Sequence, residues 1–214
     1  MRASYSTDPA LLTGESLRSL AHERLIHGDD RRYGDFTLNP EVHADLVDNP
    51  SLRPAAVLMP VFERPEGLSV LLTKRHDQLK SHSGQVAFPG GKIDAEDESA
   101  EAAALREAHE EVGLDPALAE VLGRLPDYYT GSGYRIAPVL ALVDAMASLE
   151  ANPHEVDYFF EVPFAFLMDK ANHRRGSRHF AGRERHFFEM PYGEHYIWGV
   201  TAGIIAALHD RMFS

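Results

Sequence analysis

The chain has 214 residues, of which 44% are hydrophobic and 25% are charged; it carries a formal net charge of −12 and no cysteine. The absence of cysteine excludes disulfides, thiol nucleophiles and cysteine-ligated zinc. The acidic balance argues against nucleic-acid binding, which needs concentrated lysine and arginine. An anionic substrate could still bind if a cation mediated the contact.

The sequence shows no signal for secretion or for a membrane span. Its first residues lack a basic start followed by an apolar core. No apolar run approaches the roughly 20 residues that a membrane-spanning helix needs. We therefore expect a soluble, cytoplasmic protein with no membrane partner. The length of the chain predicts one medium domain with an extra arm.

Residues 1–50 are predicted to form this arm, of helix and loop. A helix is predicted for residues 16–26, because three leucines recur there at helical spacing. A polar, glycine-punctuated loop follows, and residues 40–47 could form a second short helix. The main domain is predicted to span residues 51–214.

From Pro54 the sequence contains runs of β-branched and large apolar residues that are typical of strands. The first two runs flank RPEG, a plausible turn. The predicted strands are residues 55–62, 68–74, 119–125, 134–144, 156–163, 186–190 and 195–199. One helix within this series and another at residues 201–213 predict an α/β protein with a mixed β-sheet covered by helices.

The helix within the series is predicted for residues 98–112 (ESAEAAALREAHEEV), because alanine and glutamate are strong helix formers. Gly113 follows it, where a left-handed C-terminal cap is expected. Small apolar side chains recur every four residues and form one narrow stripe that lets the helix lie close to the sheet. The stripe consists of Ala100, Ala104, Ala108 and Val112.

Three glutamates converge beside this apolar stripe. Glu107 and Glu111 are four residues apart and share one helix face, and Glu110 lies on the adjoining flank. Like charges at this spacing repel, and no lysine offsets the pair. A divalent cation such as Mg²⁺, which prefers hard oxygen ligands, would explain the arrangement. The alternative is an ordinary solvated face of an acidic helix.

Neighbours of the glutamates could complete a metal site. A backbone carbonyl of Gly90 or Gly91 could join the ligands, because glycine lets the backbone come close. Arg106 could hold one glutamate in its rotamer through a forked hydrogen bond. The twelve histidines show no H-E-x-x-H spacing, which argues against zinc.

The spacing of these residues resembles the Nudix box, G-x5-E-x7-R-E-U-x-E-E-x-G-U, in which U is aliphatic. The glycine departs from the pattern, because Gly91 precedes Glu98 by seven positions rather than six and Lys92 occupies the standard glycine position. The loop between glycine and helix is thus one residue longer. The matching residues are Glu98, Arg106, Glu107, Ala108 (a small member of the aliphatic class), Glu110, Glu111, Gly113 and Leu114.

A second segment is similar to the signature of the coenzyme A pyrophosphatase branch of the Nudix superfamily, L-L-T-x-R-[SA]-x3-R-x3-G-x3-F-P-G-G. Residues 71–91 read LLTKRHDQLKSHSGQVAFPGG and match it at Arg75 and Gly84. Lys80 replaces an arginine, and His76 replaces a small residue. The similarity extends downstream through TGSGYRIAP and YIWGVTAGII, so that it covers the chain from about Pro54 onward.

The resemblance implies an α/β/α Nudix fold, a mixed β-sheet sandwiched between helices, and a reaction that uses Mg²⁺ or Mn²⁺. Coenzyme A would be hydrolysed at its pyrophosphate to 3′,5′-ADP and 4′-phosphopantetheine. The implied metal ligands are Glu107, Glu111, Glu110 and Gly91. Glu110 could instead act as the base, and Arg106 would support the glutamates. Glu155, on a later loop, is another candidate base, although a solvated loop acid is the alternative.

The substrate phosphates are expected to bind Arg75 and Lys80, with Gly84 in the same signature; His82 is a weaker candidate. The expected partner is a small nucleotide-like molecule, and the chain could be a monomer or a homodimer. The alternative substrates are other nucleoside diphosphate derivatives such as ADP-ribose or NADH, or a nucleoside triphosphate. A ligand-sensing Nudix module without activity would be expected to lack the metal glutamates, and this sequence keeps all three.

Overall fold

The computed structural model describes residues 8–26, 31–76, 84–180 and 182–214. Within them the α-helices are α1 (Gly14–Ala21), α2 (His43–Val47), α3 (Ala100–Val112), α4 (Phe164–Met168) and α5 (Val200–Phe213). The strands are β1 (Tyr33–Gly34), β2 (Arg53–Arg64), β3 (Gly67–Arg75), β4 (Val86–Ala87), β5 (Gly90–Lys92), β6 (Ala119–Arg124), β7 (Tyr128–Tyr129), β8 (Tyr134–Val143), β9 (Val156–Pro163), β10 (Arg174–Phe180), β11 (Arg183–Tyr192) and β12 (His195–Trp198).

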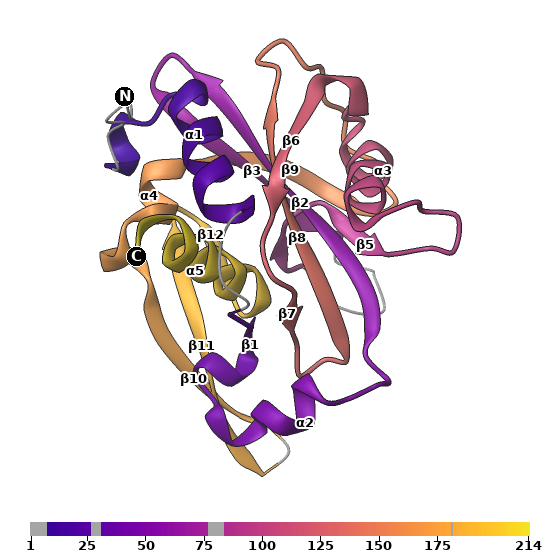
Figure 1. The fold of residues 1–214 in the computed structure, drawn as a ribbon, viewed down its shortest axis with the longest axis vertical. Coiled ribbons are helices and arrows are strands. Elements are labelled where there is room, and N and C mark those ends of the chain that lie inside the picture. Colours follow the sequence, from indigo (N-terminus) through magenta and orange to yellow (C-terminus); the bar gives the residue numbers. More distant parts are fainter. Residues whose placement is uncertain (1–7, 27–30, 77–83, 181) are drawn as a thin grey trace.

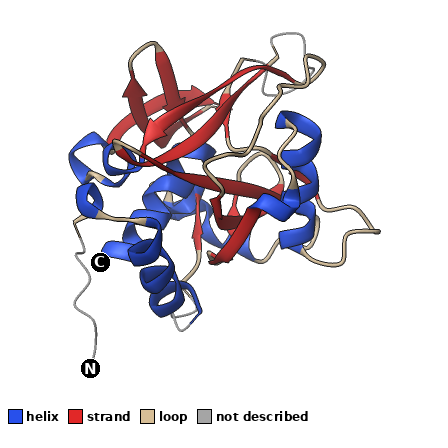
Figure 2. Cartoon of the chain, turned by 90° about the horizontal axis from the view of Figure 1, so that it is seen from above, coloured by secondary structure: helices blue, strands red, loops and turns tan. Residues whose placement is uncertain are grey.

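The strands of these described residues form two sheets, and helices lie on both sides of the larger one (Figures 1 and 2). The larger sheet has the order β1-β7-β8-β2-β3-β4, with β5 paired to β2, β6 to β8 and β9 to β3. It contains parallel and antiparallel pairs, so the predicted mixed sheet is confirmed. The smaller sheet has the order β10-β11-β12.

The centre of the larger sheet is the parallel pair β2 and β8. Its register runs from Arg53 opposite Tyr134 to Phe62 opposite Val143. Both strands are long apolar runs and are buried over most of their length. Such runs are typical of strands that are covered on both faces.

Helix α3 covers one face of this sheet through its small side chains. Ala104, Ala108 and Val112 are fully buried, and Ala100 packs at the margin of the same cluster. They contact the β2 side chains Leu58 and Phe62 among others. The predicted apolar stripe therefore positions the helix, and it brings the glutamates on the adjoining flank to the edge of the core.

The opposite face carries α1, α4, α5 and the smaller sheet, which share one large hydrophobic cluster (Figure 1). The predicted C-terminal helix is present as α5, and Ile204, Ile205 and Leu208 are buried in that cluster. Helices on both faces of a mixed sheet give the expected α/β/α arrangement.

The N-terminal residues pack into the same core as the rest of the chain. Leu17 and Leu20 of α1 are buried in the larger cluster. Tyr33 of β1 pairs with Tyr128, so this segment adds a parallel strand to the edge of the larger sheet. The described part of the arm thus shares the core of the main domain, while the proposed boundary at residue 50 stays a prediction.

Most predicted elements have a counterpart, and the largest omission is β10. Its sequence, RRGSRHF, lacks the apolar alternation that marks a half-buried strand. It pairs along its length with β11 and forms an edge of the smaller sheet in the described structure. Charged side chains are common on such edges. In the residues with described positions, no helix is long and apolar enough to cross a membrane.

Candidate active site

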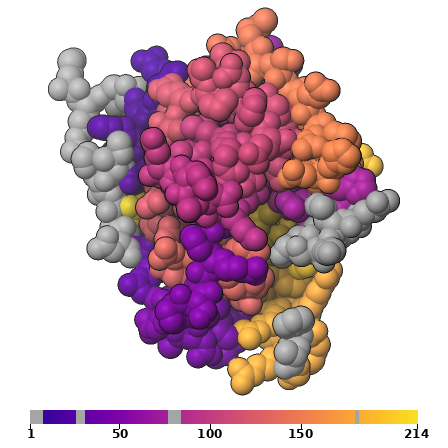
Figure 3. Space-filling view, turned by 90° about the vertical axis from the view of Figure 1, so that its right-hand side faces the viewer, coloured from indigo at the N-terminus to yellow at the C-terminus, as the bar shows by residue number. Residues whose placement is uncertain are grey.

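The C-terminal end of α3 is held by a left-handed cap and by the loop between β8 and β9, whose Ala147 and Leu149 pack against the same hydrophobic cluster as α3. Gly113 has φ 67° and donates its N–H to His109 O at 2.9 Å, as predicted for a glycine cap. The N–H groups of Glu150 and Asn152 donate to Val112 O and Glu111 O, both at 2.9 Å. The loop thereby satisfies carbonyls that a helix end leaves open. In the space-filling view the loop region (orange) lies beside the α3 region (magenta and pink) (Figure 3).

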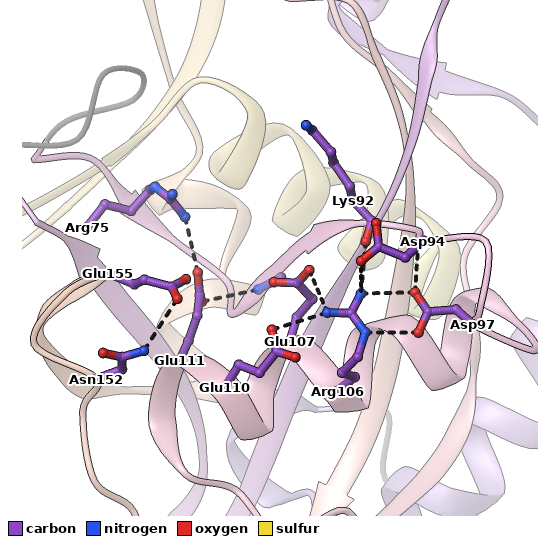
Figure 4. A network of polar contacts seen from close by, with 11 residues as sticks. Arg75, Lys92, Asp94, Asp97, Arg106, Glu107, Glu110, Glu111, Asn152 and Glu155 are labelled. Atoms are coloured by element: carbon purple, nitrogen blue, oxygen red, sulfur yellow. Dashed lines mark hydrogen bonds and ion pairs between the residues drawn. The ribbon is translucent and has the colours of Figure 1, made fainter.

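The same loop brings Glu155 to the glutamates of α3. Glu155 N donates to Asn152 O at 3.0 Å, and Asn152 Nδ2 donates to Glu155 Oε1 at 3.3 Å. The Glu155 carboxylate lies beside Glu111 (Figure 4). It is close enough to raise the pKa of both Glu107 and Glu111, although burial is the larger cause for each.

Glu111 is the most enclosed acid of the site, with 1% of its surface exposed. Its Oε1 accepts a hydrogen bond from Arg75 Nη1 at 3.1 Å, and its Oε2 accepts one from Gly90 N at 3.2 Å (Figure 4). Burial raises the pKa of Glu111 to about 7, against the opposing effect of Arg75 and the Gly90 N–H. A buried carboxylate of this kind is stabilised by a nearby cation.

Glu107 lies one turn earlier, with its carboxylate against the backbone of β5. A Cβ atom at residue 91 would overlap this carboxylate, so the glycine at that position makes room for it. Burial raises the pKa of Glu107 even though Arg106 Nη1 donates to its Oε1 at 3.0 Å. Glu110 is the exposed member of the group, with 49% of its side chain accessible.

Arg106 connects the glutamates to the loop before α3. Its Nε and Nη2 donate to Asp97 Oδ1 and Oδ2, both at 2.9 Å, and Nη2 also donates to Lys92 O at 3.1 Å. Its Nη1 reaches Glu107 at 3.0 Å and Glu110 Oε2 at 3.2 Å. The fork that we expected on a glutamate therefore lies on Asp97, whose pKa is lowered by Arg106.

The predicted substrate residues are only partly described. Arg75 points to Glu111, and its Nε is buried without a hydrogen-bond partner among the described residues. Gly84 donates its N–H to Arg75 O at 3.2 Å, so it supports the backbone of that strand end. Lys80 and His82 lie outside the described residues.

The structure thus brings together seven of the predicted site residues, which come from β3, β5, α3 and the loop before β9. They are Arg75, Gly91, Arg106, Glu107, Glu110, Glu111 and Glu155. Sequence reasoning missed Asp97, Asn152 and the Gly90 N–H. Asp97 stands nine residues before Arg106, too far for a helix-spacing argument, and an Asn-Pro pair such as the one at 152 is typical of a turn rather than of a site.

The donor set suits a hard divalent cation. Across the described ranges, no three Asp, Glu, His or Cys side chains stand close enough together to hold a metal as they lie. The carboxylates instead pair with Arg75 and Arg106. The site nevertheless has features that Mg²⁺ or Mn²⁺ favours. It offers several carboxylates, of which Glu111 is buried and has a raised pKa, and Gly91 leaves room for Glu107.

Comparisons with known proteins agree with this site. The family model of the NUDIX domain matches residues 52–182. The chain belongs to the Nudix family. The Nudix hydrolase NudL of Escherichia coli (strain K12) is 38% identical over 171 residues, which cover 80% of this chain and 87% of that protein. NudL of Shigella boydii serotype 4 is 37% identical over the same coverage.

Solved Nudix structures are also similar to the chain. The Nudix hydrolase RenU of M. smegmatis aligns with a TM-score of 0.42 and 26% identity, over 52% of this chain and 70% of its own. Membership in the family identifies the chain as a Nudix hydrolase, an enzyme that acts on small nucleotide derivatives. Nudix hydrolases generally use divalent metal ions, which agrees with the carboxylate-rich site.

Proposed function

We propose that this Nudix hydrolase cleaves the pyrophosphate bond of coenzyme A or its derivatives, giving 3′,5′-ADP and 4′-phosphopantetheine. The observation that carries the proposal is the ion pair between Arg75 and Glu111, in which Nη1 and Oε1 are 3.1 Å apart. Arg75 belongs to the segment that resembles the coenzyme A pyrophosphatase signature, and Glu111 belongs to the Nudix box. Because the two meet in one site, a phosphate bound by the arginine lies next to the glutamates.

Glu107, Glu111 and Glu110 are the proposed ligands of Mg²⁺ or Mn²⁺, with a backbone contribution at Gly91. Such an ion would neutralise negative charge on the pyrophosphate and lower the pKa of bound water. Arg75 carries a buried Nε without a hydrogen-bond partner in the described structure, and it is the proposed phosphate clamp. Lys80 is a further proposed phosphate contact, from its place in the signature.

The proposed reaction is addition of water across the phosphoanhydride. The water oxygen attacks one phosphorus, the bridging oxygen leaves on the other phosphate, and a carboxylate accepts the water proton. Glu155 is a proposed base because it lies beside Glu111 and is held by Asn152. Glu110, the most exposed of the three helix glutamates, is the other. Arg106 is proposed to orient Glu107 and Glu110 rather than to contact the substrate.

The test is a substrate panel of coenzyme A, an acyl-coenzyme A, NADH, ADP-ribose and dGTP, each with Mg²⁺ and with Mn²⁺. The products are separated and identified by mass. The proposal expects the highest kcat/KM for coenzyme A or its acyl ester, with 3′,5′-ADP as a product. A clear preference for NADH, ADP-ribose or dGTP would replace it with another Nudix pyrophosphatase activity. Absence of hydrolysis across the panel would favour a ligand-sensing module instead.

A further inference from the structure

The first acid of the Nudix box, Glu98, is not the acid that receives the fork of the box arginine, Arg106. Glu98 stands in the register of the pattern, yet its side chain is exposed, and the described structure places no ion pair between it and Arg106. Asp97, one residue earlier, is turned inward and only 6% of its side chain is accessible. The loop that is one residue longer than the pattern thus ends with a different acid on the arginine.

The contacts of Asp97 fix its carboxylate from two sides. It receives both arms of the Arg106 fork at 2.9 Å. Its Oδ2 also accepts the N–H of Asp94 at 2.8 Å, and Asp97 N donates to Asp94 O at 3.2 Å. Asp97 is therefore locked into the loop by its own backbone and by that of Asp94. A bidentate carboxylate–guanidinium pair fixes orientation as well as distance.

The Asp97–Arg106 pair fixes the orientation of the guanidinium (Figure 4). Nε and Nη2 donate hydrogen bonds to Asp97, and Nη2 donates also to Lys92 O. The remaining nitrogen, Nη1, therefore points to Glu107 and Glu110. Because a guanidinium is planar and rigid, rotating it away from Asp97 would move Nη1 away from both glutamates. The position of Glu107 in turn matters, because it lies in the space that Gly91 leaves open.

We propose that Asp97, and not Glu98, is the positioning residue that holds Arg106 and, through it, the metal-binding glutamates Glu107 and Glu110. The inference concerns the same site as the proposed function: the Mn²⁺ measurement rests on the proposed metal ligands, and the activity measurement rests also on the proposed reaction. Partners that orient metal ligands commonly change metal affinity or activity by about 10- to 100-fold when they are removed. Asp97 is expected to act in that range without touching the substrate.

The chain offers a matched pair of variants, since Asp97→Asn and Glu98→Gln each remove one negative charge from adjacent residues. Mn²⁺ binding to each protein is measured by electron paramagnetic resonance, which needs no substrate. We expect Asp97→Asn to weaken Mn²⁺ binding by at least about tenfold and Glu98→Gln to change it by less than about twofold. Equal effects of the two variants, or a larger effect of Glu98→Gln, would overturn the proposal.

A second variant tests whether Asp97 acts through Arg106. Arg106→Lys keeps the charge and loses the fork, so it is expected to weaken Mn²⁺ binding as Asp97→Asn does. Adding Asp97→Asn to Arg106→Lys should then change the affinity by less than about twofold, because both interrupt one chain of contacts. Independent losses that multiply, or a lysine variant with the affinity of the wild type, would contradict the proposed route. If Asp97→Asn does not fold, an Arg106→Lys protein with the Mn²⁺ affinity of the wild type would still overturn the proposal. A weaker affinity of Arg106→Lys, together with an unchanged affinity of Glu98→Gln, would support it.

Activity on the best substrate of the panel separates this inference from the proposed function. With saturating Mn²⁺, Asp97→Asn is expected to lower kcat by at least about tenfold while KM changes by less than about threefold, because the residue positions metal ligands and not substrate. A change confined to KM would refute the positioning role. If the panel shows no hydrolysis, the proposed function fails, and the Mn²⁺ measurements still decide the role of Asp97.

Discussion

The carboxylate of Glu107 lies against the backbone of Gly91, in the space that any side chain at residue 91 would fill. Glu107 comes from α3, whereas Gly91 comes from β5, which pairs with β2 at Ala56. The contact therefore joins α3, the helix of the proposed metal ligands, to the main sheet. It explains why the chain has glycine at the last position of the FPGG sequence, independently of any backbone freedom.

Gly91→Ala is expected to reduce activity far more than stability. The new methyl group meets the far end of a flexible glutamate, which can move aside at small cost to the fold. A displacement of a catalytic group by about 1 Å can lower the rate by roughly 100-fold. The measurements are kcat with saturating Mn²⁺ and the melting temperature. Full activity in this variant would show that the position of Glu107 is unimportant.

Gly90→Ala is the control, because it should lower the stability of the fold more than Gly91→Ala does. A Cβ atom there would overlap Ala56 O and come within 2.7 Å of Val57 Cα, and neither backbone atom can move freely. Gly90 also has φ 158°, at the border of the region that favours glycine. We expect a clearly lower melting temperature for Gly90→Ala than for Gly91→Ala. Equal melting temperatures would argue against this difference between the two glycines.

Glu111→Gln is expected to lower turnover by at least about 100-fold, the scale of losing a central electrostatic group. The amide keeps the size of the side chain but not the charge that a hard cation needs. Circular dichroism and kcat with Mg²⁺ or Mn²⁺ check the two parts of the prediction. A folded variant with a rate near that of the wild type would remove Glu111 from the site.

The same residue should make the stability of the metal-free protein depend on pH. Burial raises the pKa of Glu111 from 4.5 to about 7, so the folded state binds its proton more tightly than the unfolded state does. The contribution to stability is then present below about pH 4.5 and is lost as the pH rises through 7, by an amount on the order of 3 kcal/mol. In the presence of a chelator, the melting temperature of Glu111→Gln relative to that of the wild type should rise between pH 5 and pH 8. A constant difference over this range would contradict the raised pKa.

The glutamates could be predicted from sequence because a helix has a fixed period. The spacing of four positions from Glu107 to Glu111 places them on one face in any α-helix, and the buried alanines determine which face meets the sheet. The Asp97 contact could not be predicted in this way. It depends on the path of a loop that begins where β5 pairs with β2, a pairing between residues far apart in sequence.

Glu155 shows an intermediate case. Its loop had no periodic pattern, so only its acidity marked it as a candidate. What brings it to the site is the cap on α3, where the N–H groups of Glu150 and Asn152 meet the last carbonyls of the helix. The open carbonyls could be expected from the helix alone, but the segment that satisfies them could not. Arg75, by contrast, matched the signature in the sequence. Its contact with Glu111, like the position of Glu155, became visible only in the fold.

The N-terminal segment should be needed for stability rather than for chemistry. Leu17 is fully buried in the larger hydrophobic cluster, and Leu→Ala changes at such positions cost about 2–5 kcal/mol. Leu17→Ala is therefore expected to lower the melting temperature while kcat at a permissive temperature stays within about twofold. Leu11, which is 67% exposed, supplies the control, since Leu11→Ala should change neither quantity. A stable Leu17→Ala protein that has lost its activity would instead assign chemistry to this segment.

Substrate choice is expected to depend on Lys80, the residue at which the signature has an arginine. Coenzyme A differs from 3′-dephospho-coenzyme A by one phosphate, and charge-assisted contacts to phosphate are among the stronger hydrogen bonds. Lys80→Ala should therefore weaken activity on coenzyme A more than activity on the dephospho form. Lys80→Arg should recover or exceed the original preference, because the guanidinium fork matches a phosphate better than an ammonium does. The measurement is the ratio of kcat/KM for the two substrates in the wild type and both variants. If the ratio is the same in all three proteins, Lys80 does not recognise the 3′-phosphate, and Arg75 remains as the cation of the signature that a phosphate could reach.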